Sequence, residues 1–171
     1  AQWTLDTYTI TYNLDGGTNG ANPATYTVLT PTITLQPATK AGYTFGGWYD
    51  NAGFSGSAVT QIPVGSTGNV VLYAKFTAVY AVTYDGNGST GGTAPVDALS
   101  PYAAGATVTV LGEGSLVRTG YTFVDWDTAS DGSGTNYATG ATFTMPAAAV
   151  TLFAQWTLDT YTITYNLDGG T

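Results

Sequence analysis

The stretch TYTITYNLDGG (residues 7–17) alternates aromatic or aliphatic side chains with threonine and asparagine, and it ends in a turn sequence. Successive side chains on a strand point to opposite faces, so Tyr8, Ile10 and Tyr12 would line one apolar face. The Asp-Gly-Gly ending is typical of a tight turn. The stretch therefore predicts a β-strand with one buried face, closed by a turn.

The same stretch returns near the other end of the sequence. Residues 1–18 and 154–171 both read AQWTLDTYTITYNLDGGT, which sets a period of 153 residues (154 − 1). Self-similarity at a fixed period is the signature of a tandem array. We expect residues 1–6 to be the end of a preceding repeat and residues 157–171 to be the partial start of a further one.

A shorter repeat lies within this period. Three motifs recur in the same order. YTITYNLDG at 8–16 returns as YAVTYDGNG at 80–88, and GYTFGGWYD at 42–50 returns as GYTFVDWDT at 120–128. VVLYAKF at 70–76 returns as VTLFAQW at 150–156. Their offsets differ by a few residues, which indicates loop insertions. The sequence thus predicts two diverged copies, repeat A at residues 7–77 and repeat B at residues 78–156.

The composition favours β-structure. Only 8% of the residues are charged and 13% are aromatic, whereas charged residues make up roughly 25% of ordinary soluble domains. Aromatic and β-branched side chains suit a pleated sheet, and the 23 glycines suit turns. Glycine or proline interrupts or flanks the best helix candidates, residues 97–104 and 112–118. We predict a mostly β fold with at most a turn or two of helix in each copy.

The apolar side of each alternation predicts the core. A small domain needs large aromatic side chains to bury enough area. The expected core residues are Tyr8, Tyr12, Tyr43, Phe45, Trp48, Leu72 and Phe76 in repeat A, and Tyr80, Tyr84, Tyr121, Phe123, Trp126, Leu152 and Trp156 in repeat B. Tyr26, Tyr102 and Tyr137 lie in less regular segments, so they are the candidates for surface contact with a glycan or a host protein.

Charge and residue types exclude several function classes. The sequence has neither histidine nor cysteine, which rules out Ser-His and Cys-His nucleophiles and thiolate metal sites. We expect no catalytic residue, no cofactor and no enzyme activity. The net charge is −8, and Lys40, Lys75 and Arg118 are the only basic residues. No basic stripe can neutralise phosphates, so nucleic acid is excluded as a partner, and no apolar run suits membrane insertion.

Three carboxylates form one candidate metal site. Asp125, Asp127 and Asp131 lie within seven residues, and clustered oxygens are what Ca²⁺ prefers. The spacing is not that of an EF-hand, and the bidentate glutamate is missing. A solvated strand edge followed by an Asp-Gly hairpin turn explains the pattern better. We therefore expect no structural role for Ca²⁺.

The pattern Gly-Tyr-Thr-Phe-x-x-Trp, followed by a glycine-rich hairpin and Val-x-Leu-Tyr/Phe-Ala, resembles the Listeria–Bacteroides repeat family, the B-repeats of internalin-type surface proteins. The resemblance covers residues 8–76 and 80–156. It implies a small β-grasp (ubiquitin-like) sheet whose helix is shortened or lost. It also implies non-catalytic proteins at the bacterial cell surface or secreted from it, with partners that are generally unclear.

The joints between copies are short. Residues 77–79 and 157–160 contain neither glycine nor proline, unlike flexible linkers. We therefore expect a semi-rigid rod in which each repeat contacts its neighbours. The function expected for such a rod is that of a stalk in an extracellular, adhesin-like protein. A multivalent glycan- or host-protein-binding module is the alternative, and an enzyme is a distant third. The unpaired strand in residues 157–171 also predicts weak head-to-tail self-association.

Overall fold

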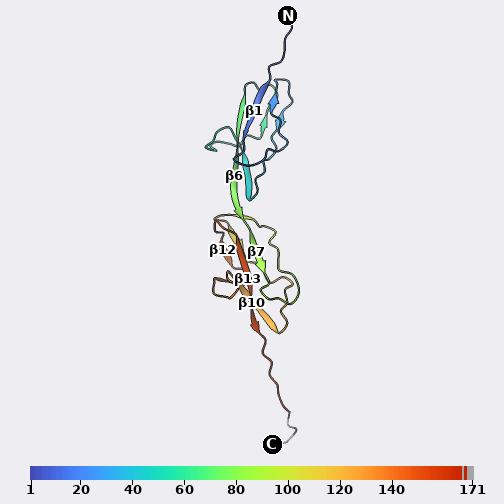
Figure 1. Cartoon of the computed structure of the whole chain (residues 1–171), viewed down its shortest axis with the longest axis vertical. Helices are drawn as coiled ribbons and strands as arrows, with labels where there is room; N and C mark the ends of the chain where they lie inside the picture. Colours follow the sequence, from blue (N-terminus) through green and yellow to red (C-terminus); the bar gives the residue numbers. More distant parts are fainter. Residues whose placement is uncertain (167, 169–171) are drawn as a thin grey trace. The chain divides into compact units, whose positions relative to one another are not determined.

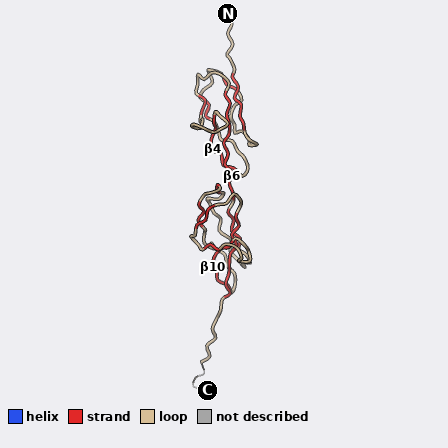
Figure 2. Tube along the Cα trace, turned by 90° about the vertical axis from the view of Figure 1, so that its left-hand side faces the viewer, coloured by secondary structure: helices blue, strands red, loops and turns tan. Residues whose placement is uncertain are grey.

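The chain forms two compact units, Ala1–Val79 and Tyr80–Thr171. A computed structural model describes residues 1–166 and 168. All regular structure among these residues is β-strand, with no helix at residues 97–104 or 112–118 (Figures 1 and 2). The mostly β prediction is confirmed.

The first unit is built on a mixed sheet. Its strands are β1 (Tyr8–Asn13), β2 (Thr25–Tyr26), β3 (Ile33–Thr34), β4 (Tyr43–Tyr49), β5 (Gln61–Ile62) and β6 (Val70–Tyr80), whose last residue belongs to the second unit. The strand order is β2-β1-β6-β4, and β3 and β5 pair separately. β1 runs parallel to β6, whereas β4 runs antiparallel to it. The last strand of the copy is therefore the centre of its sheet.

The second unit repeats this plan. Its strands are β7 (Val82–Asp85), β8 (Tyr102–Ala103), β9 (Thr107–Thr109), β10 (Tyr121–Asp127), β11 (Asn136–Tyr137), β12 (Thr142–Thr144) and β13 (Val150–Leu158). The main sheet has the order β11-β10-β13-β7, and β9 pairs with β12. β7 is parallel to β13, as β1 is to β6. A parallel pair requires a long crossover, which here consists of loops and short strands instead of a helix.

One tryptophan anchors each core. Trp48 is 2% exposed and Trp126 is fully buried. The indole N–H of Trp48 donates to the carbonyl of Gln36, and that of Trp126 donates to the carbonyl of Leu111, both at 2.9 Å. An aromatic ring from the first strand packs against each indole, with centroids 5.1 Å apart for Tyr12–Trp48 and 4.8 Å for Tyr84–Trp126.

The other expected core residues divide into three groups. Leu72, Tyr84 and Leu152 are buried like the tryptophans. Seven more are partly buried and pack against the two cores, namely Tyr8, Tyr12, Phe45, Phe76, Tyr80, Phe123 and Trp156. Tyr43 and Tyr121 differ from the prediction, because Tyr43 is 41% exposed and Tyr121 is only half-buried. Each is the first residue of its strand, and each contacts a basic side chain, Lys40 for Tyr43 and Arg118 for Tyr121.

Most of the expected linker residues lie in strands, namely residues 77–79 in β6 and residues 157–158 in β13. In the first unit Ala78 and Thr77 pair with the start of β4, and the Val79 N–H donates to the Gly42 carbonyl at 2.9 Å. In the second unit β13 continues to Leu158, and the Asp159 N–H donates to the Gly120 carbonyl at 2.9 Å. The last strand of each sheet therefore runs past residues 77 and 156, to Tyr80 in β6 and Leu158 in β13.

Candidate functional site

The three tyrosines expected at the surface differ in their exposure. Tyr26 is 4% exposed and belongs to the core of the first unit. Its ring lies 5.5 Å from that of Tyr8, and its hydroxyl donates to the Gly68 carbonyl at 2.6 Å. The sequence interpretation of Tyr26 was wrong, because a strand of two residues has no alternation from which burial can be inferred.

The other two tyrosines are half-buried in the second unit. Tyr137 packs against Phe143 with ring centroids 5.1 Å apart. The hydroxyl of Tyr102 donates to Asp97 Oδ2 at 2.6 Å. Desolvation, together with this hydrogen bond and the negative charge of Asp97, raises the pKa of Tyr102 to about 12. Both side chains therefore have packing or hydrogen-bonding roles within the unit.

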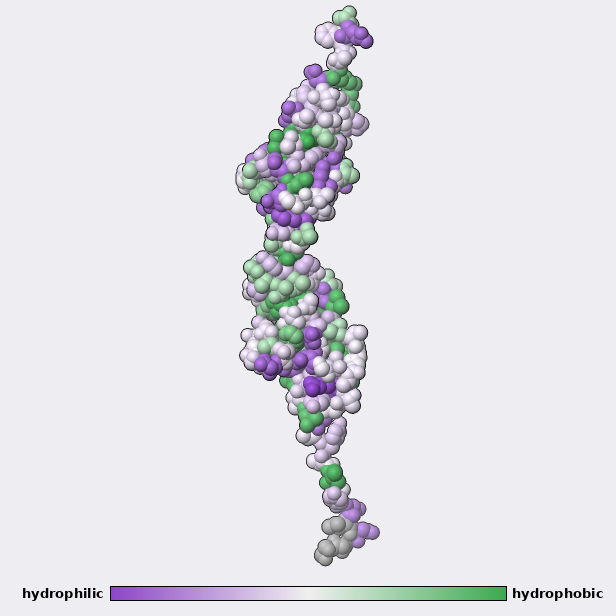
Figure 3. Space-filling view, in the orientation of Figure 1, coloured by the Kyte–Doolittle hydropathy of each residue, from purple (hydrophilic) through white to green (hydrophobic). Residues whose placement is uncertain are grey.

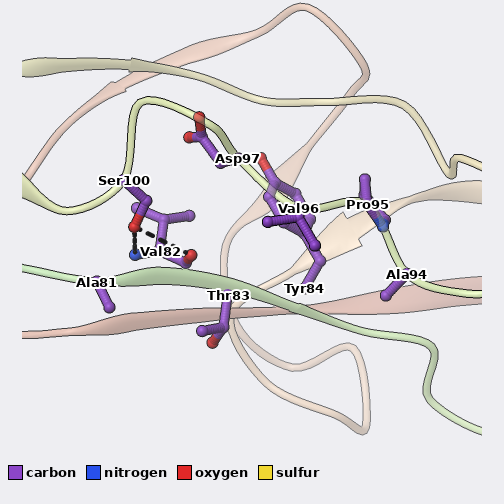
Figure 4. Close-up of a pocket in the computed structure, with 9 residues that line it drawn as sticks. All are labelled: Ala81, Val82, Thr83, Tyr84, Ala94, Pro95, Val96, Asp97 and Ser100. Carbon is purple, nitrogen blue, oxygen red and sulfur yellow. Dashed lines mark hydrogen bonds between the residues drawn. The ribbon is translucent and has the colours of Figure 1, made fainter.

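A groove follows one edge of β7 in the second unit. It has a volume of about 370 Å³ and is lined by residues 81–84, residues 94–97 and Ser100. Figure 4 shows Ser100 beside Val82, where its hydroxyl receives the Val82 N–H at 3.0 Å and donates to the Val82 carbonyl at 3.4 Å. We refer to this feature as the β7 groove.

The polar groups of the β7 groove are largely bonded to one another. Asp97 accepts hydrogen bonds from the Tyr102 hydroxyl and the Leu99 N–H. The Tyr84 hydroxyl accepts the Leu111 N–H, and burial raises the pKa of Tyr84. Sequence reasoning did not single out Asp97 or Ser100, because they lie in a segment with no strand periodicity. The groove thus offers shape and some apolar surface but few free polar groups.

The surface of each unit is mixed in character. Figure 3 shows polar and apolar residues interspersed over the visible face of both units. Exposed large apolar side chains include Val64 in the first unit and Val96 and Val124 in the second. They lie in separate segments, and scattered apolar residues of this kind are normal on soluble domains.

The aspartates of the β10–β11 hairpin separate into two kinds. Asp131 Oδ1 accepts the Ser133 N–H at 3.1 Å and the Ser133 hydroxyl at 2.7 Å, and these hydrogen bonds lower the pKa of Asp131. Asp127 is fully buried, and its Oδ1 accepts the N–H groups of Ala129 and Gly134 at 2.6 and 3.0 Å. Asp131 thus forms the exposed turn, while Asp127 holds the base of the hairpin. No group of three or more acidic, histidine or cysteine side chains converges within the described residues.

Two further observations concern the whole described chain. None of its regular structure is helical, so no helix in the described residues is long and apolar enough to span a membrane. No solved structure matches the chain.

Curated proteins that the chain resembles are much longer than it is. A "Putative membrane protein" of Evansella cellulosilytica is 36% identical over 160 residues, which cover 91% of this chain and 23% of that protein. A "Putative Gly-rich membrane protein" of the same organism is 33% identical over 176 residues, covering 95% of this chain and 20% of that protein. Internalin H of Listeria monocytogenes is 37% identical over 81 residues, covering 45% of this chain and 14% of internalin H.

The two copies inferred from the sequence coincide with a known repeat. The Listeria-Bacteroides repeat domain family matches residues 8–75 and residues 80–155. These two matches account for most of the chain and correspond to the sheets built around Trp48 and Trp126. The chain therefore belongs to the Listeria-Bacteroides repeat domain family.

Proposed function

We propose that this chain is a non-catalytic stalk module of a tandem-repeat bacterial surface protein, exposed outside the cell. The observation that carries the proposal is the strand character of the joints. Val79 is bonded to the start of β4, and only Ala81 separates β6 from β7. A joint without free linker residues favours a semi-rigid rod of successive repeats.

Several other features support this function. The cores use aromatic packing and backbone hydrogen bonds, and the sequence has no histidine or cysteine for acid–base or thiol chemistry. The relatives are named as membrane proteins and as an internalin, which favours placement in the cell envelope and, beyond it, at the extracellular surface. The parallel pairing of first and last strands supports a β-grasp-like sheet whose helix has been replaced by loops.

Spin labels can test the rod directly, because the protein has no cysteine. Val64→Cys and Val124→Cys place one label on each unit, at side chains that are 59% and 53% exposed. Double electron–electron resonance should give a narrow distance distribution. A matched chain with a flexible insert of six residues (Gly-Ser-Gly-Ser-Gly-Ser) between Tyr80 and Ala81 should give a broad distance distribution. Such an insert spans about 13 Å on average and fluctuates widely. Equally broad distributions in both chains would contradict the rod.

A binding module is the second candidate function, and the β7 groove favours it. Val96 is 88% exposed beside the groove, so Val96→Asp should weaken a ligand that uses the groove without unfolding the unit. A screen of glycans and host-cell proteins against the chain, repeated with this variant, tests the alternative. Binding that is lost in the variant would favour a multivalent binder over a spacer.

We also propose weak head-to-tail association through residues 157–171. Ile163 repeats Ile10, yet Ile10 is 5% exposed and Ile163 is 77% exposed. Tyr161 and Tyr165, which repeat Tyr8 and Tyr12, are 82% and 78% exposed. The segment could replace β1 in another molecule, since the two sequences are identical. Leu167, the last residue of the expected apolar face, lies outside the described residues.

Sedimentation velocity at several concentrations tests the association. The control chain should end at Asp159, not at Trp156, because Leu158 still pairs with β10. Concentration-dependent sedimentation of the full chain, absent from the control, is the expected result. Monomeric behaviour of both chains would refute the exchange.

A further inference from the structure

Two buried carboxylate oxygens in the second unit have no hydrogen-bond partner. They are Asp125 Oδ1 and Asp127 Oδ2, and they are the only buried side-chain polar atoms of this kind in the described part of the chain. Asp127 is fully buried, so its unpartnered oxygen is shielded from water by the protein itself. An unpartnered, buried anionic oxygen is costly and normally faces a cation or a donor.

The two oxygens belong to one face of one strand. Asp125 and Asp127 flank Trp126 on β10, and Trp126 points into the core. Their side chains therefore share the opposite, outer face, with Cα atoms about 6.6 Å apart at the usual strand rise. The hairpin that follows folds back over this face, since Asp127 Oδ1 is bonded to the N–H groups of Ala129 and Gly134.

Two amide side chains lie on the same face. Asn136 is the partner of Asp127 on β11, and Gln155 is the partner of Asp125 on β13. Asn136 Nδ2 donates to Asp125 Oδ2 at 2.9 Å, while Gln155 Nε2 donates to the carbonyls of Ala129 and Phe153. With their nitrogen atoms used in this way, the amide oxygens of both residues remain available as neutral ligands.

No basic side chain of the protein compensates these charges. Arg118 is the only basic residue of the second unit, and its guanidinium lies over the Tyr121 ring, 4.0 Å from the centroid. The one ion pair within the described residues, Lys40–Asp15, belongs to the first unit. The two carboxylates therefore depend on something from solution.

The first unit has no carboxylate at the equivalent positions of this face. Trp48 pairs with Ala74 at the same register position as Trp126 with Ala154 in the second unit. Around it the first unit has Gly47, Tyr49 and Lys75, with the Lys75 ammonium 5.5 Å from the centroid of the Tyr49 ring. The second unit has an aspartate in place of Gly47, another in place of Tyr49 and a glutamine in place of Lys75. The second unit has thus exchanged an ammonium group for two negative charges.

We propose that the outer face of β10 binds a calcium ion between Asp125 and Asp127. Calcium accepts six to eight oxygen ligands at about 2.3–2.6 Å in flexible geometry, so one ion can bridge two carboxylates at this spacing. The amide oxygens of Asn136 and Gln155 and water complete its coordination. Magnesium, which demands a stricter octahedron and keeps its water, fits the site less well.

This site differs from the calcium loop considered from the sequence. Asp131 is not part of it, because both hydrogen bonds of its Oδ1 close the exposed turn at Ser133. The sequence favoured a solvated strand edge for Asp125 and Asp127 and a hairpin turn for Asp131. The structure supports the turn at Asp131, whereas Asp127 is fully buried. The hairpin folds over β10 and buries one oxygen of Asp125 and one of Asp127, whereas Asp131 lies in the exposed turn. A linear motif does not show this difference.

Calcium titration of the chelator-treated full chain tests the proposal. At a CaCl₂ concentration about five times Kd, the Tm of the second unit should rise by about 4–8 °C, and the first unit should not respond. Amide NMR signals of Asp125, Asp127 and Gln155 should shift, whereas those of Gly47, Tyr49 and Lys75 should not. An equal concentration of MgCl₂ should have a smaller effect.

Three variants complete the test. Asp125→Asn with Asp127→Asn should abolish the response to calcium, while Asp131→Asn should leave it unchanged. Gln155→Lys introduces the ammonium that Lys75 provides in the first unit, so it should raise the Tm without calcium and remove most of the calcium response. Gln155→Lys keeps both aspartates, so it remains informative if the double variant fails to fold.

The following results would overturn the proposal. Absence of any calcium-dependent shift would do so, as would a shift that persists in both the double variant and Gln155→Lys.

Discussion

Replacing the core tryptophan of one copy should unfold that copy and leave the other folded. Trp126 is fully buried in the second unit, where it packs between Tyr84 and Phe123 with ring centroids 4.8 and 5.2 Å away. Removing a buried tryptophan costs about 3–5 kcal/mol. The Leu111 carbonyl also loses its donor, which adds roughly 1–3 kcal/mol if water cannot reach it. We expect Trp126→Ala to destabilise the second unit by about 4–8 kcal/mol.

This loss is large relative to the stability of such a unit. The first unit has 79 residues, and domains of this size are stable by about 4–12 kcal/mol. Trp48→Ala should therefore leave the first unit marginally folded or unfolded, since its Nε1 makes the equivalent hydrogen bond to Gln36. Trp3 provides the matched control, because it is 90% exposed and Trp3→Ala should change stability by less than about 0.5 kcal/mol.

Urea denaturation followed by amide NMR can report on each copy separately. Leu72 and Leu152, both fully buried in the central strands β6 and β13, serve as the probes for the two units. In Trp126→Ala the midpoint at Leu152 should fall sharply, and that at Leu72 should stay nearly constant. A loss below about 1 kcal/mol would show that the indole does not anchor the core. Equal losses at both probes would refute independent cores.

Two further predictions concern the second unit. Gly92 has φ +76°, and a Cβ there would lie 1.8 Å from the Ser115 carbonyl oxygen, so Gly92→Ala should cost more than about 1 kcal/mol in urea denaturation. Gly91→Ala is the control, because a Cβ there meets nothing within 4 Å, and equal losses would contradict the steric argument. The pKa of Tyr102 is raised from 10 to about 12 in the folded protein, so folding favours the neutral hydroxyl. Its contribution to the free energy of unfolding is therefore complete below pH 10 and is lost as the pH rises to about 12. Tyr102→Phe, which cannot ionise next to Asp97, should show a smaller loss of stability between pH 10 and 12, and an unchanged pH profile would refute this.

The sequence was most informative where periodicity is strong. Strands β1, β4 and β6 follow the alternating stretches quoted for repeat A, and β7, β10 and β13 follow their counterparts in repeat B. The resemblance to the Listeria-Bacteroides repeat family, carried by the same motifs, is confirmed. Periodicity did not mark the strand ends, however. Residues 77–79 belong to the sheet because β4 is long enough to pair with them, which depends on a distant segment.

Burial outside the long strands could not be inferred in the same way. Tyr26 is buried because its two-residue strand pairs with β1 and its hydroxyl reaches Gly68, 42 residues away in the sequence. Asp127 is buried because the hairpin folds over the outer face of β10. Both outcomes depend on tertiary contacts that local pattern does not encode, and they override local propensity.

Around the core tryptophan the two copies agree on the inner side of the sheet and differ on its outer side. On the core side, Trp48 and Trp126 occupy the same register, each bonded to a carbonyl of the crossover and each packed against a tyrosine of the first strand. On the outer side, one copy has a lysine over an aromatic ring, whereas the other has two carboxylates, each with one buried oxygen that lacks a hydrogen-bond partner. Exchange of core residues would cost several kcal/mol, whereas the outer face can change as long as its charge is compensated. Differences in ligand or ion binding between alternating repeats should therefore arise from the outer face of β4 and β10, on sheets whose cores remain alike.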